Sequence, residues 1–168
     1  MPLPDAEALL AALTEQMRPA VSSETRLVGI HTGGVWLARR LHDALSLGAP
    51  LGTMDVSFYR DDYGSRGLHA RVRPSEIPFE IADADVILVD DVLFTGRTIR
   101  AALNELFDYG RPRRVRLAAL VDRGGRELPI AAQFVGAEVT VRDDEQIELK
   151  KAADGRLSLV VNPAPGAT

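Results

Sequence analysis

The sequence contains no cysteine, which excludes a disulfide framework and catalysis by a thiolate. It also lacks any apolar run near the roughly 20 residues that a membrane-spanning helix needs. The first ten residues have neither a basic start nor a long apolar stretch, so we expect a cytoplasmic protein. No internal repeat or low-complexity block interrupts the 168 residues.

A strong excess of one charge is also missing, since 20 basic residues stand against 24 acidic ones for a net charge of −4. This balance does not indicate a general nucleic-acid-coating protein, although it leaves room for a local basic face. Hydrophobic residues make up 46% of the chain, enough to bury one core. We therefore predict a single domain over residues 1–168, with residues 162–168 as a frayed tail.

The most informative stretch is residues 86–98, in which an apolar strand is followed by two carboxylates, a small polar loop and a helix. Residues 86–89 suit a strand buried on both faces of a parallel sheet. Asp90 and Asp91 then come at its carboxyl end, where ligands bind in open α/β sheets. Apolar residues recur at helical spacing afterwards, so residues 95–98 should lie at a helix N-terminus, where free amides favour an anion.

A ribose 5-phosphate suits both halves of this stretch. Asp90 and Asp91 accept hydrogen bonds from vicinal ribose hydroxyls, and the hydroxyls of Thr95 and Thr98 donate to phosphate oxygens. Gly96 allows the backbone to approach the anion closely. The alternative is a buried strand that ends in a solvated acidic turn with an N-capping threonine.

The other segments alternate between helix and strand, which favours a mainly parallel sheet in an α/β fold. We predict a first helix over residues 6–17, a strand over 26–30, a helix over 35–45, a strand through Met54, Val56 and Phe58 with one face buried, a strand at 117–121 and a hairpin over 147–161. The helix after residue 98 should bury Ile99, Ala102, Leu103, Leu106 and Phe107.

Three further segments are candidate functional elements. The turn at residues 31–34 has amides and a Thr32 hydroxyl that can hold a second anion, although glycine turns are also common packing geometry. Residues 60–77 are rich in charge, glycine and proline, which fits an active-site lid or a mobile surface excursion. After the strand at 117–121, Arg123 and Arg126 either serve a ligand or pair with neighbouring carboxylates; we favour the ligand for Arg123 and pairing for Arg126.

Residues 86–98 closely resemble the signature with which type I phosphoribosyltransferases bind 5-phosphoribosyl 1-diphosphate. Further segments occur in the matching order. They are residues 27–34 (Leu-Val-Gly-Ile-His-Thr-Gly-Gly), 57–62 (Ser-Phe-Tyr-Arg-Asp-Asp) and 120–130 (Leu-Val-Asp-Arg-Gly-Gly-Arg-Glu-Leu-Pro-Ile). From about Leu27 to about Gly136, the chain is similar to the bifunctional regulators of pyrimidine-operon attenuation that are also uracil phosphoribosyltransferases.

This resemblance implies a type I phosphoribosyltransferase fold, with a mainly parallel twisted sheet flanked by helices, a small β-rich hood and a flexible lid loop. It implies a glycosyltransferase that converts uracil and 5-phosphoribosyl 1-diphosphate to UMP and diphosphate with Mg²⁺, through positioning and electrostatics. It also implies a homo-oligomer and a role in attenuation through pyr leader mRNA.

By the same resemblance, roles pass to individual residues. Asp90, Asp91 and Arg97 are catalytic, and the ribose 5-phosphate is held by Asp90, Asp91, Val92, Leu93, Phe94, Thr95, Gly96, Arg97 and Thr98. The diphosphate loop is His31, Thr32, Gly33 and Gly34, and the base contacts are Arg123 and Ile147. The lid contributes Arg60, Asp61 and Asp62, with Arg66, Arg71 and Arg73 as further diphosphate candidates, while Asp122 approaches the metal directly or through water.

Departures from the family pattern affect both activities. The family commonly has arginine where this chain has Gly33, and losing a charge-assisted contact to the leaving group would slow turnover by about tenfold or more. Acidic residues stand where basic ones are frequent at Glu15, Glu76, Asp143 and Asp144, and each exchange removes a contact to RNA phosphate.

Our hypothesis is an enzyme-like pyrimidine sensor whose RNA regulation is weakened or relocated, and the basic residues Arg111, Arg113, Arg114 and Arg116 are a candidate substitute. The alternatives are a weakly catalytic or non-catalytic UMP-sensing RNA-binding regulator, a nucleotide-binding scaffold, and an enzyme for a purine or orotate.

Overall fold

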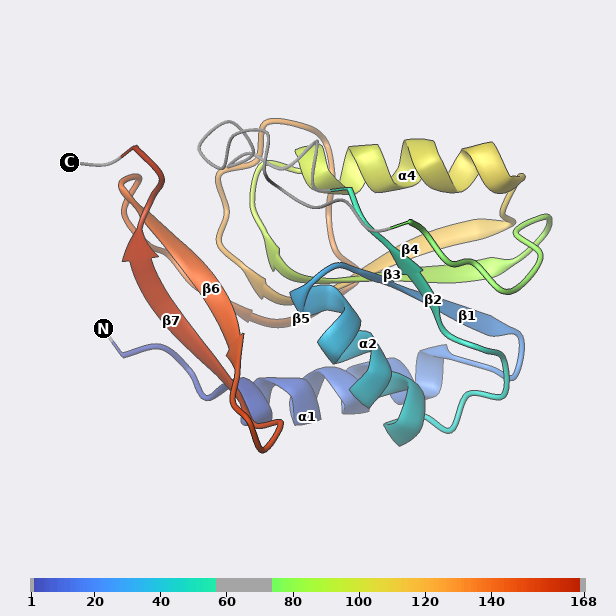
Figure 1. Cartoon of the computed structure of the whole chain (residues 1–168), viewed down its shortest axis with the longest axis horizontal. Coiled ribbons are helices and arrows are strands. Elements are labelled where there is room, and N and C mark those ends of the chain that lie inside the picture. Colours follow the sequence, from blue (N-terminus) through green and yellow to red (C-terminus); the bar gives the residue numbers. More distant parts are fainter. Residues whose placement is uncertain (1, 57–73, 167–168) are drawn as a thin grey trace.

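The computed structural model describes residues 2–56 and 74–166 of the chain. Five parallel strands form a sheet in the order β2-β1-β3-β4-β5, and an antiparallel hairpin, β6–β7, stands at one end of it (Figure 1). The strands are β1 (Thr25–Ile30), β2 (Gly52–Met54), β3 (Asp85–Leu93), β4 (Arg114–Asp122), β5 (Phe134–Glu138), β6 (Glu145–Lys151) and β7 (Leu157–Pro163). The helices are α1 (Ala6–Met17), the 3-10 turn η1 (Arg18–Ala20), α2 (Gly33–Ala44) and α4 (Arg97–Tyr109). This arrangement confirms the predicted α/β class.

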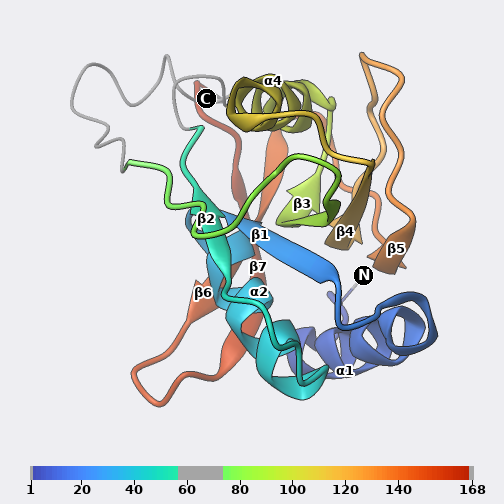
Figure 2. The same ribbon diagram turned by 90° about the vertical axis from the view of Figure 1, so that its right-hand side faces the viewer.

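Helices cover both faces of the sheet, with α1 and α2 on one face and α4 on the other (Figure 2). The side chains of β3 alternate between these layers: Ile87 and Val89 pack with α1 and α2, while Val86 and Leu88 pack with α4. All four are fully buried. Burying such a side chain stabilises the fold by about 1.5–3 kcal/mol, so the central strand anchors both layers.

Helix α1 occupies the range that its apolar spacing predicts. Asp5 caps its start by accepting a hydrogen bond from the Ala8 N–H at 3.2 Å, and Leu13 and Met17 are buried against the sheet. Near its end, the Gln16 side chain donates to the Val135 carbonyl at 2.7 Å and accepts from the Val135 N–H at 3.3 Å. The amide thus pairs with β5 as a neighbouring strand would, which blunts an edge that sheets otherwise leave open.

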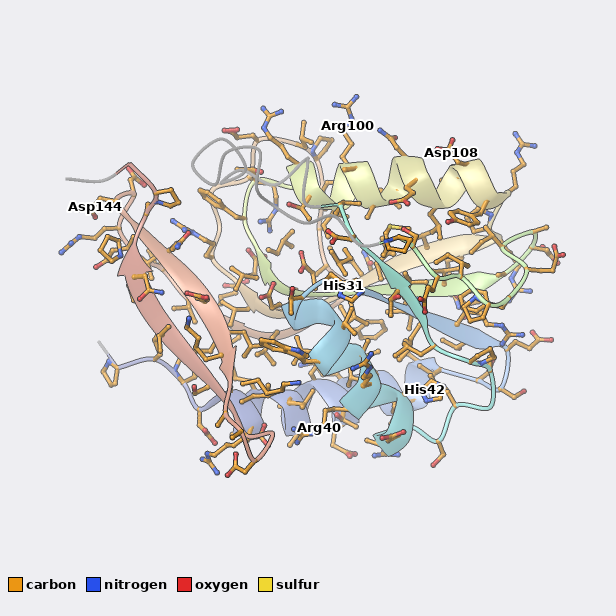
Figure 3. The ribbon with its side chains drawn as sticks, viewed as in Figure 1. His31, Arg40, His42, Arg100, Asp108 and Asp144 are labelled. Atoms are coloured by element: carbon orange, nitrogen blue, oxygen red, sulfur yellow. The ribbon has the colours of Figure 1, made fainter. Side chains whose placement is uncertain are left out.

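Helix α4 is amphipathic, with Ile99, Ala102 and Leu106 buried against the sheet. Arg100 and Asp108 project from its outer side (Figure 3). The apolar face is narrower than predicted, because Phe107 is 54% exposed. Its neighbour Leu106 is fully buried, so Phe107 lies on a side of the helix that faces away from the sheet.

An ion network closes the amino ends of β1, β3 and β4. Asp85 is buried and receives hydrogen bonds from Arg114 at 3.0 Å and Arg116 at 3.0 Å, while the Thr25 hydroxyl lies 3.4 Å away. Burial raises the pKa of Asp85, but the two guanidinium groups outweigh that effect and hold the pKa below its ordinary value. This end of the sheet is therefore built for stability and lies opposite the carboxyl ends of the strands.

Two predicted segments differ in the structure. β2 is a strand of three residues that are all buried, whereas the sequence predicts a half-buried strand through Met54, Val56 and Phe58, the last of which lies outside the described residues. Thr53 pairs with Glu76 and Phe79 lies over Gly52, so a later segment of the chain covers β2. The predicted frayed tail is wrong at its start, since Asn162 belongs to β7 and the Ala164 N–H donates to the Asp144 carbonyl at 2.8 Å. In the described part of the chain, no helix is long and apolar enough to cross a membrane.

Candidate phosphoribosyl site

The candidate site lies at the carboxyl edge of the sheet, where β3 outruns its neighbour β1. The last pair between these strands is Gly29 with Val89, whereas β3 stays paired with β4 as far as Leu93 with Asp122. Asp90 and Asp91 lie in this overhang. The Asp90 side chain accepts from the Asp91 N–H at 2.9 Å, and that of Asp91 accepts from the next N–H at 2.9 Å, so both carboxylates are oriented by the backbone.

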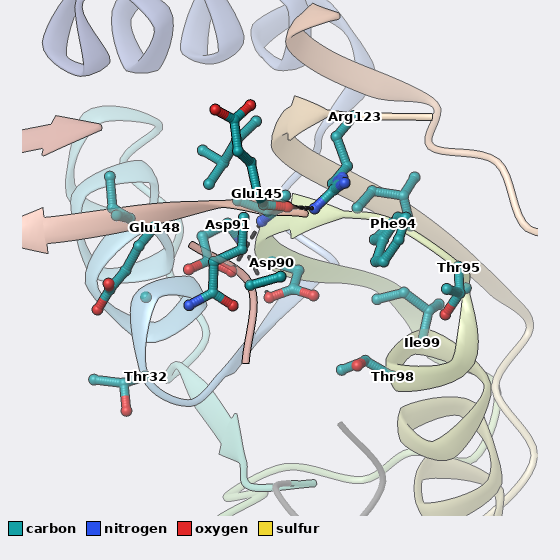
Figure 4. Close-up of a pocket in the computed structure, with 18 of the residues that line it drawn as sticks. Thr32, Asp90, Asp91, Phe94, Thr95, Thr98, Ile99, Arg123, Glu145 and Glu148 are labelled. Atoms are coloured by element: carbon teal, nitrogen blue, oxygen red, sulfur yellow. Dashed lines mark hydrogen bonds between the residues drawn. The ribbon is translucent and has the colours of Figure 1, made fainter. Parts of the chain in front are cut away.

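A cavity of about 760 Å³ opens between this edge and the hairpin β6–β7 (Figure 4). It brings together residues from three segments that the sequence singles out, and from the hairpin. The predicted site residues that line it are His31, Thr32, Gly33, Asp90, Asp91, Val92, Leu93, Phe94, Thr95, Gly96, Thr98, Arg123 and Ile147.

The loop that precedes α4 has the geometry of an anion site. Gly96 caps the helix with φ 95°, a left-handed conformation that favours glycine, and Thr95 is buried. The Thr95 Oγ1 accepts a hydrogen bond from the Arg97 N–H at 3.2 Å. The backbone carbonyl of Thr95 accepts from the N–H groups of Glu127 and Leu128. Because the first amides of a helix lack helical partners, α4 directs the positive end of its dipole toward the cavity.

A second helix N-terminus faces the same cavity from the opposite side, where Thr32 caps α2 after a cis peptide bond between His31 and Thr32. Gly34 lies against the Val89 carbonyl so closely that a Cβ would collide with it. At Gly33 a Cβ would collide with the Asp91 carboxylate. The absence of a side chain at Gly33 therefore gives Asp91 its place beside the loop.

Asp122 is held in a pair away from the cavity lining. Its Oδ2 accepts from Arg126 at 2.6 Å, and its Oδ1 accepts from the Gly124 N–H at 2.9 Å. Burial raises the pKa of Asp122, but these two hydrogen bonds outweigh it and hold the pKa below its ordinary value. Arg126 also donates to the Phe94 carbonyl at 2.6 Å, so the pair with Asp122 that we predicted for Arg126 supports the phosphate motif.

Two predicted site arginines differ in their environment. Arg97 is half exposed, lies 3.3 Å from Glu127, and is not among the cavity residues. Arg123 lines the cavity, with its guanidinium 3.9 Å from the centre of the Phe94 ring and its Nη1 3.0 Å from the Glu145 carbonyl. The predicted lid residues Arg60, Asp61 and Asp62 lie outside the described residues.

Several cavity residues were not predicted as site residues. They are Trp36, Ile99, Asp143, Glu145, Gln146, Glu148, Leu149, Ala164 and Pro165. Most belong to the hairpin and the segment after it, whose alternating pattern indicates strands but not which edge of the sheet they cover. Together with Asp90 and Asp91, the hairpin gives the described lining a marked excess of carboxylates.

Comparison with protein families and solved structures defines the class. Residues 3–148 match the family described as phosphoribosyl transferase domain. Hypoxanthine phosphoribosyltransferase from Trypanosoma cruzi superposes with a TM-score of 0.64 at 20% identity, over 82% of this chain and 80% of that one. Purine phosphoribosyltransferase from Pyrococcus horikoshii superposes with a TM-score of 0.61 at 24% identity, over 80% of this chain and 82% of that one. These structures share the phosphoribosyltransferase fold.

Curated relatives narrow the class further. Proteins named Bifunctional protein PyrR are 50% identical in Pseudomonas fluorescens, over 95% of this chain and 97% of the relative, and 51% identical in Nitrosococcus oceani, over 84% and 81%. The relative from Pseudomonas syringae is 52% identical, over 89% of this chain and 90% of the relative. The chain therefore belongs to the phosphoribosyltransferase family and, within it, to the group of bifunctional PyrR proteins.

Proposed function

We propose that the protein is a uracil phosphoribosyltransferase, in which N1 of uracil bonds to C1′ of 5-phosphoribosyl 1-diphosphate while the bond from C1′ to the diphosphate oxygen breaks. The proton on N1 is released to the departing diphosphate or to solvent. The observation that carries this proposal is the meeting of Asp90 and Asp91 with two helix N-termini around one cavity. A ribose with anionic groups at both ends needs this arrangement of hydroxyl acceptors between two anion sites.

Each half of the cavity has a distinct task in this reaction. The loop at Thr95 and Thr98 holds the 5-phosphate, and the turn at Thr32 holds the diphosphate. Asp90 and Asp91 accept hydrogen bonds from the ribose hydroxyls and favour the positive charge that develops on the ring as the leaving group departs. Because these groups are fixed before the substrate binds, orientation and electrostatics supply the catalysis.

A magnesium ion fits this donor set. The described residues contain no cluster of three or more histidine, aspartate or glutamate side chains that could hold a metal alone. Mg²⁺ is commonly held by one or two carboxylates together with substrate phosphates and water. Asp90 and Asp91 line the cavity, with the Asp91 carboxylate against Gly33 of the diphosphate turn. Bound there, it would neutralise the leaving diphosphate. Asp122 suits this role less well, because both its oxygens already accept hydrogen bonds.

The assay measures UMP formed from uracil and 5-phosphoribosyl 1-diphosphate with Mg²⁺, with orotate, hypoxanthine and guanine as competing bases. We expect uracil-specific turnover. In the double variant Asp90→Asn, Asp91→Asn, the kcat/KM for 5-phosphoribosyl 1-diphosphate should fall by about 100-fold or more, because two charged acceptors are lost, each worth roughly 1.5–3 kcal/mol. Arg142→Lys, on the exposed turn before β6, is the matched control. Unchanged turnover in the double variant would refute the assigned site.

A second candidate function is pyrimidine-responsive control of transcription attenuation, which the name of the relatives as bifunctional proteins favours. We propose that UMP binding persists while the grip on leader RNA is weak. Two acidic residues at the expected RNA positions neutralise nearby arginines, since Glu15 pairs with Arg18 at 3.0 Å and Asp144 pairs with Arg142 at 2.9 Å. We also propose a homo-oligomer, by resemblance alone.

The basic residues that follow α4 offer little in compensation. Arg114 and Arg116 are both committed to Asp85 at the amino end of the sheet, and Arg116 is largely buried. Arg113 lies 3.9 Å from Glu24. These contacts favour the interpretation of this cluster as structural.

A further inference from the structure

Arg123 joins two parts of the cavity that come from distant segments of the chain. Its backbone N–H donates to the Leu93 carbonyl at 3.0 Å, which ties the residue to the phosphate motif. Its guanidinium lies over the Phe94 ring, 3.9 Å from the centre, and its Nη1 donates to the Glu145 carbonyl at 3.0 Å (Figure 4). A longer contact of 3.5 Å reaches the Arg142 carbonyl. The side chain therefore spans from β3 to the first residues of the hairpin.

The Phe94 ring under this guanidinium is held firmly. Gly125 has φ 75°, and a Cβ there would lie 2.5 Å from the Phe94 Cε1, so the glycine leaves room for the ring. The Phe94 carbonyl accepts from Arg126 at 2.6 Å, which fixes its backbone. A guanidinium stacked on a fixed ring has little freedom to move. The position of the Phe94 ring therefore fixes the position of the carbonyl to which Arg123 donates.

The Arg123 guanidinium is also partly shielded from solvent. Burial lowers the pKa of Arg123, while the charges of Asp143 and Glu145 oppose that effect; arginine nevertheless stays charged at neutral pH. Its Nε has no hydrogen-bond partner in the described part of the chain and is shielded from solvent. The backbone carbonyls of Glu145 and Arg142 and the face of the Phe94 ring stabilise the charge of the guanidinium. Two of its donors are thus directed at carbonyls of the hairpin and the turn before it, while the Phe94 ring covers one face of the guanidinium.

We infer that Arg123 is a positioning residue, which holds the hairpin β6–β7 over the cavity and thereby sets the wall that receives the base. Ile147 is two residues beyond the Glu145 carbonyl on the same strand, is buried, and lines the cavity. The distance between the hairpin and the carboxyl edge of the sheet therefore determines how much space the cavity leaves for the flat ring of a base. This inference rests on the proposed function for the identity of the base, but the anchoring itself does not.

The anchor predicts a selective defect. A lysine at position 123 keeps the charge but loses the planar group that stacks on Phe94 while it donates to a carbonyl. The base wall should loosen, whereas the loop at Thr95 should keep its hold on phosphate. We expect the Kd for UMP to rise about tenfold or more in Arg123→Lys, with the Kd for ribose 5-phosphate changed less than about twofold.

The deciding experiment is hydrogen exchange of the full-length, ligand-free protein, beside those two affinities. Amides of β6 should exchange about tenfold or more faster in Arg123→Lys and in Phe94→Leu than in the wild type, while β1 is unaffected. The double variant should be no worse than the more affected single variant, because both changes break one unit. Arg156→Lys is the matched control, since its exposed side chain lies in the turn at the other end of the hairpin and pairs with Asp5.

The outcomes separate this inference from the proposed function. Unchanged exchange of β6 in Arg123→Lys would overturn the anchor. Faster exchange with an unchanged Kd for UMP would overturn its link to the base, and the pattern would point to Arg123 as a purely structural residue. Absence of UMP synthesis by the wild type would count against the proposed function alone, because the exchange measurement uses no substrate.

Discussion

At the scale of single residues, Gly33 and Asp91 share one volume. Because a Cβ on Gly33 would collide with the Asp91 carboxylate, a side chain here forces that carboxylate away from the loop. An arginine at this position, which the resemblance leads us to expect, would bring positive charge to the diphosphate turn but would also displace Asp91. The consequence of Gly33 therefore depends on both residues, which the sequence alone does not reveal.

The variant Gly33→Ala tests this shared volume without adding charge. We expect kcat/KM for 5-phosphoribosyl 1-diphosphate to fall about tenfold, equivalent to roughly 1.4 kcal/mol, as Asp91 leaves its position. The melting temperature should change little, because a carboxylate at the edge of a cavity rotates easily. Gly48→Ala is the control, since nothing lies within 4 Å of the added Cβ. Equal kinetics in both variants would contradict the argument.

At the scale of elements, local signals were sufficient for some segments. α1 occupies the range that its apolar spacing predicts, and the hairpin β6–β7 lies where the sequence predicts one over residues 147–161. The burial of β2 was misjudged because Glu76, which pairs with Thr53, and Phe79, which lies over Gly52, come from another part of the chain. The cavity residues Trp36 and Glu148 escaped prediction for the same reason: tertiary packing brings them to the sheet edge.

The amino ends of β1, β3 and β4 supply a test of stability. Asp85 has a lowered pKa in the folded protein, so its contribution is complete above the ordinary value of 3.8 and is lost as the pH falls through the lower folded value. At pH 7, Asp85→Asn should lower the free energy of unfolding by about 3–5 kcal/mol, because two guanidinium groups lose their shared partner. Urea unfolding of both proteins from pH 7 down to pH 2.5 measures the difference, which should shrink below pH 4. A constant difference would show that charge is not the cause.

At the scale of the whole molecule, function and stability occupy opposite ends of one sheet. The cavity uses the carboxyl ends of the strands, whereas the buried ion network around Asp85 lies at their amino ends. Variants at the two ends should therefore behave independently, since distant sites that share no partners have additive effects.

RNA binding is the property that belongs to the molecular surface. Glu15 is exposed and solvent screens its pair with Arg18, so Glu15→Arg should leave the fold intact. If α1 faces RNA, this variant should bind leader RNA more tightly in the presence of UMP. The slope of log K against log salt should then steepen by about 1 to 2. Glu24→Arg, before β1, is the matched control for added charge. Equal gains in both variants would indicate nonspecific attraction.

The Gln16 amide on β5 has a consequence for association between molecules. An exposed sheet edge is a template on which another chain can add a strand, and the outermost strand of this sheet has one such position occupied by the molecule itself. A second chain that approached β5 would have to displace Gln16 before it formed ladder bonds at Val135. The Gln16 side chain, which belongs to a helix, thus opposes edge-to-edge aggregation by occupying the backbone groups of Val135.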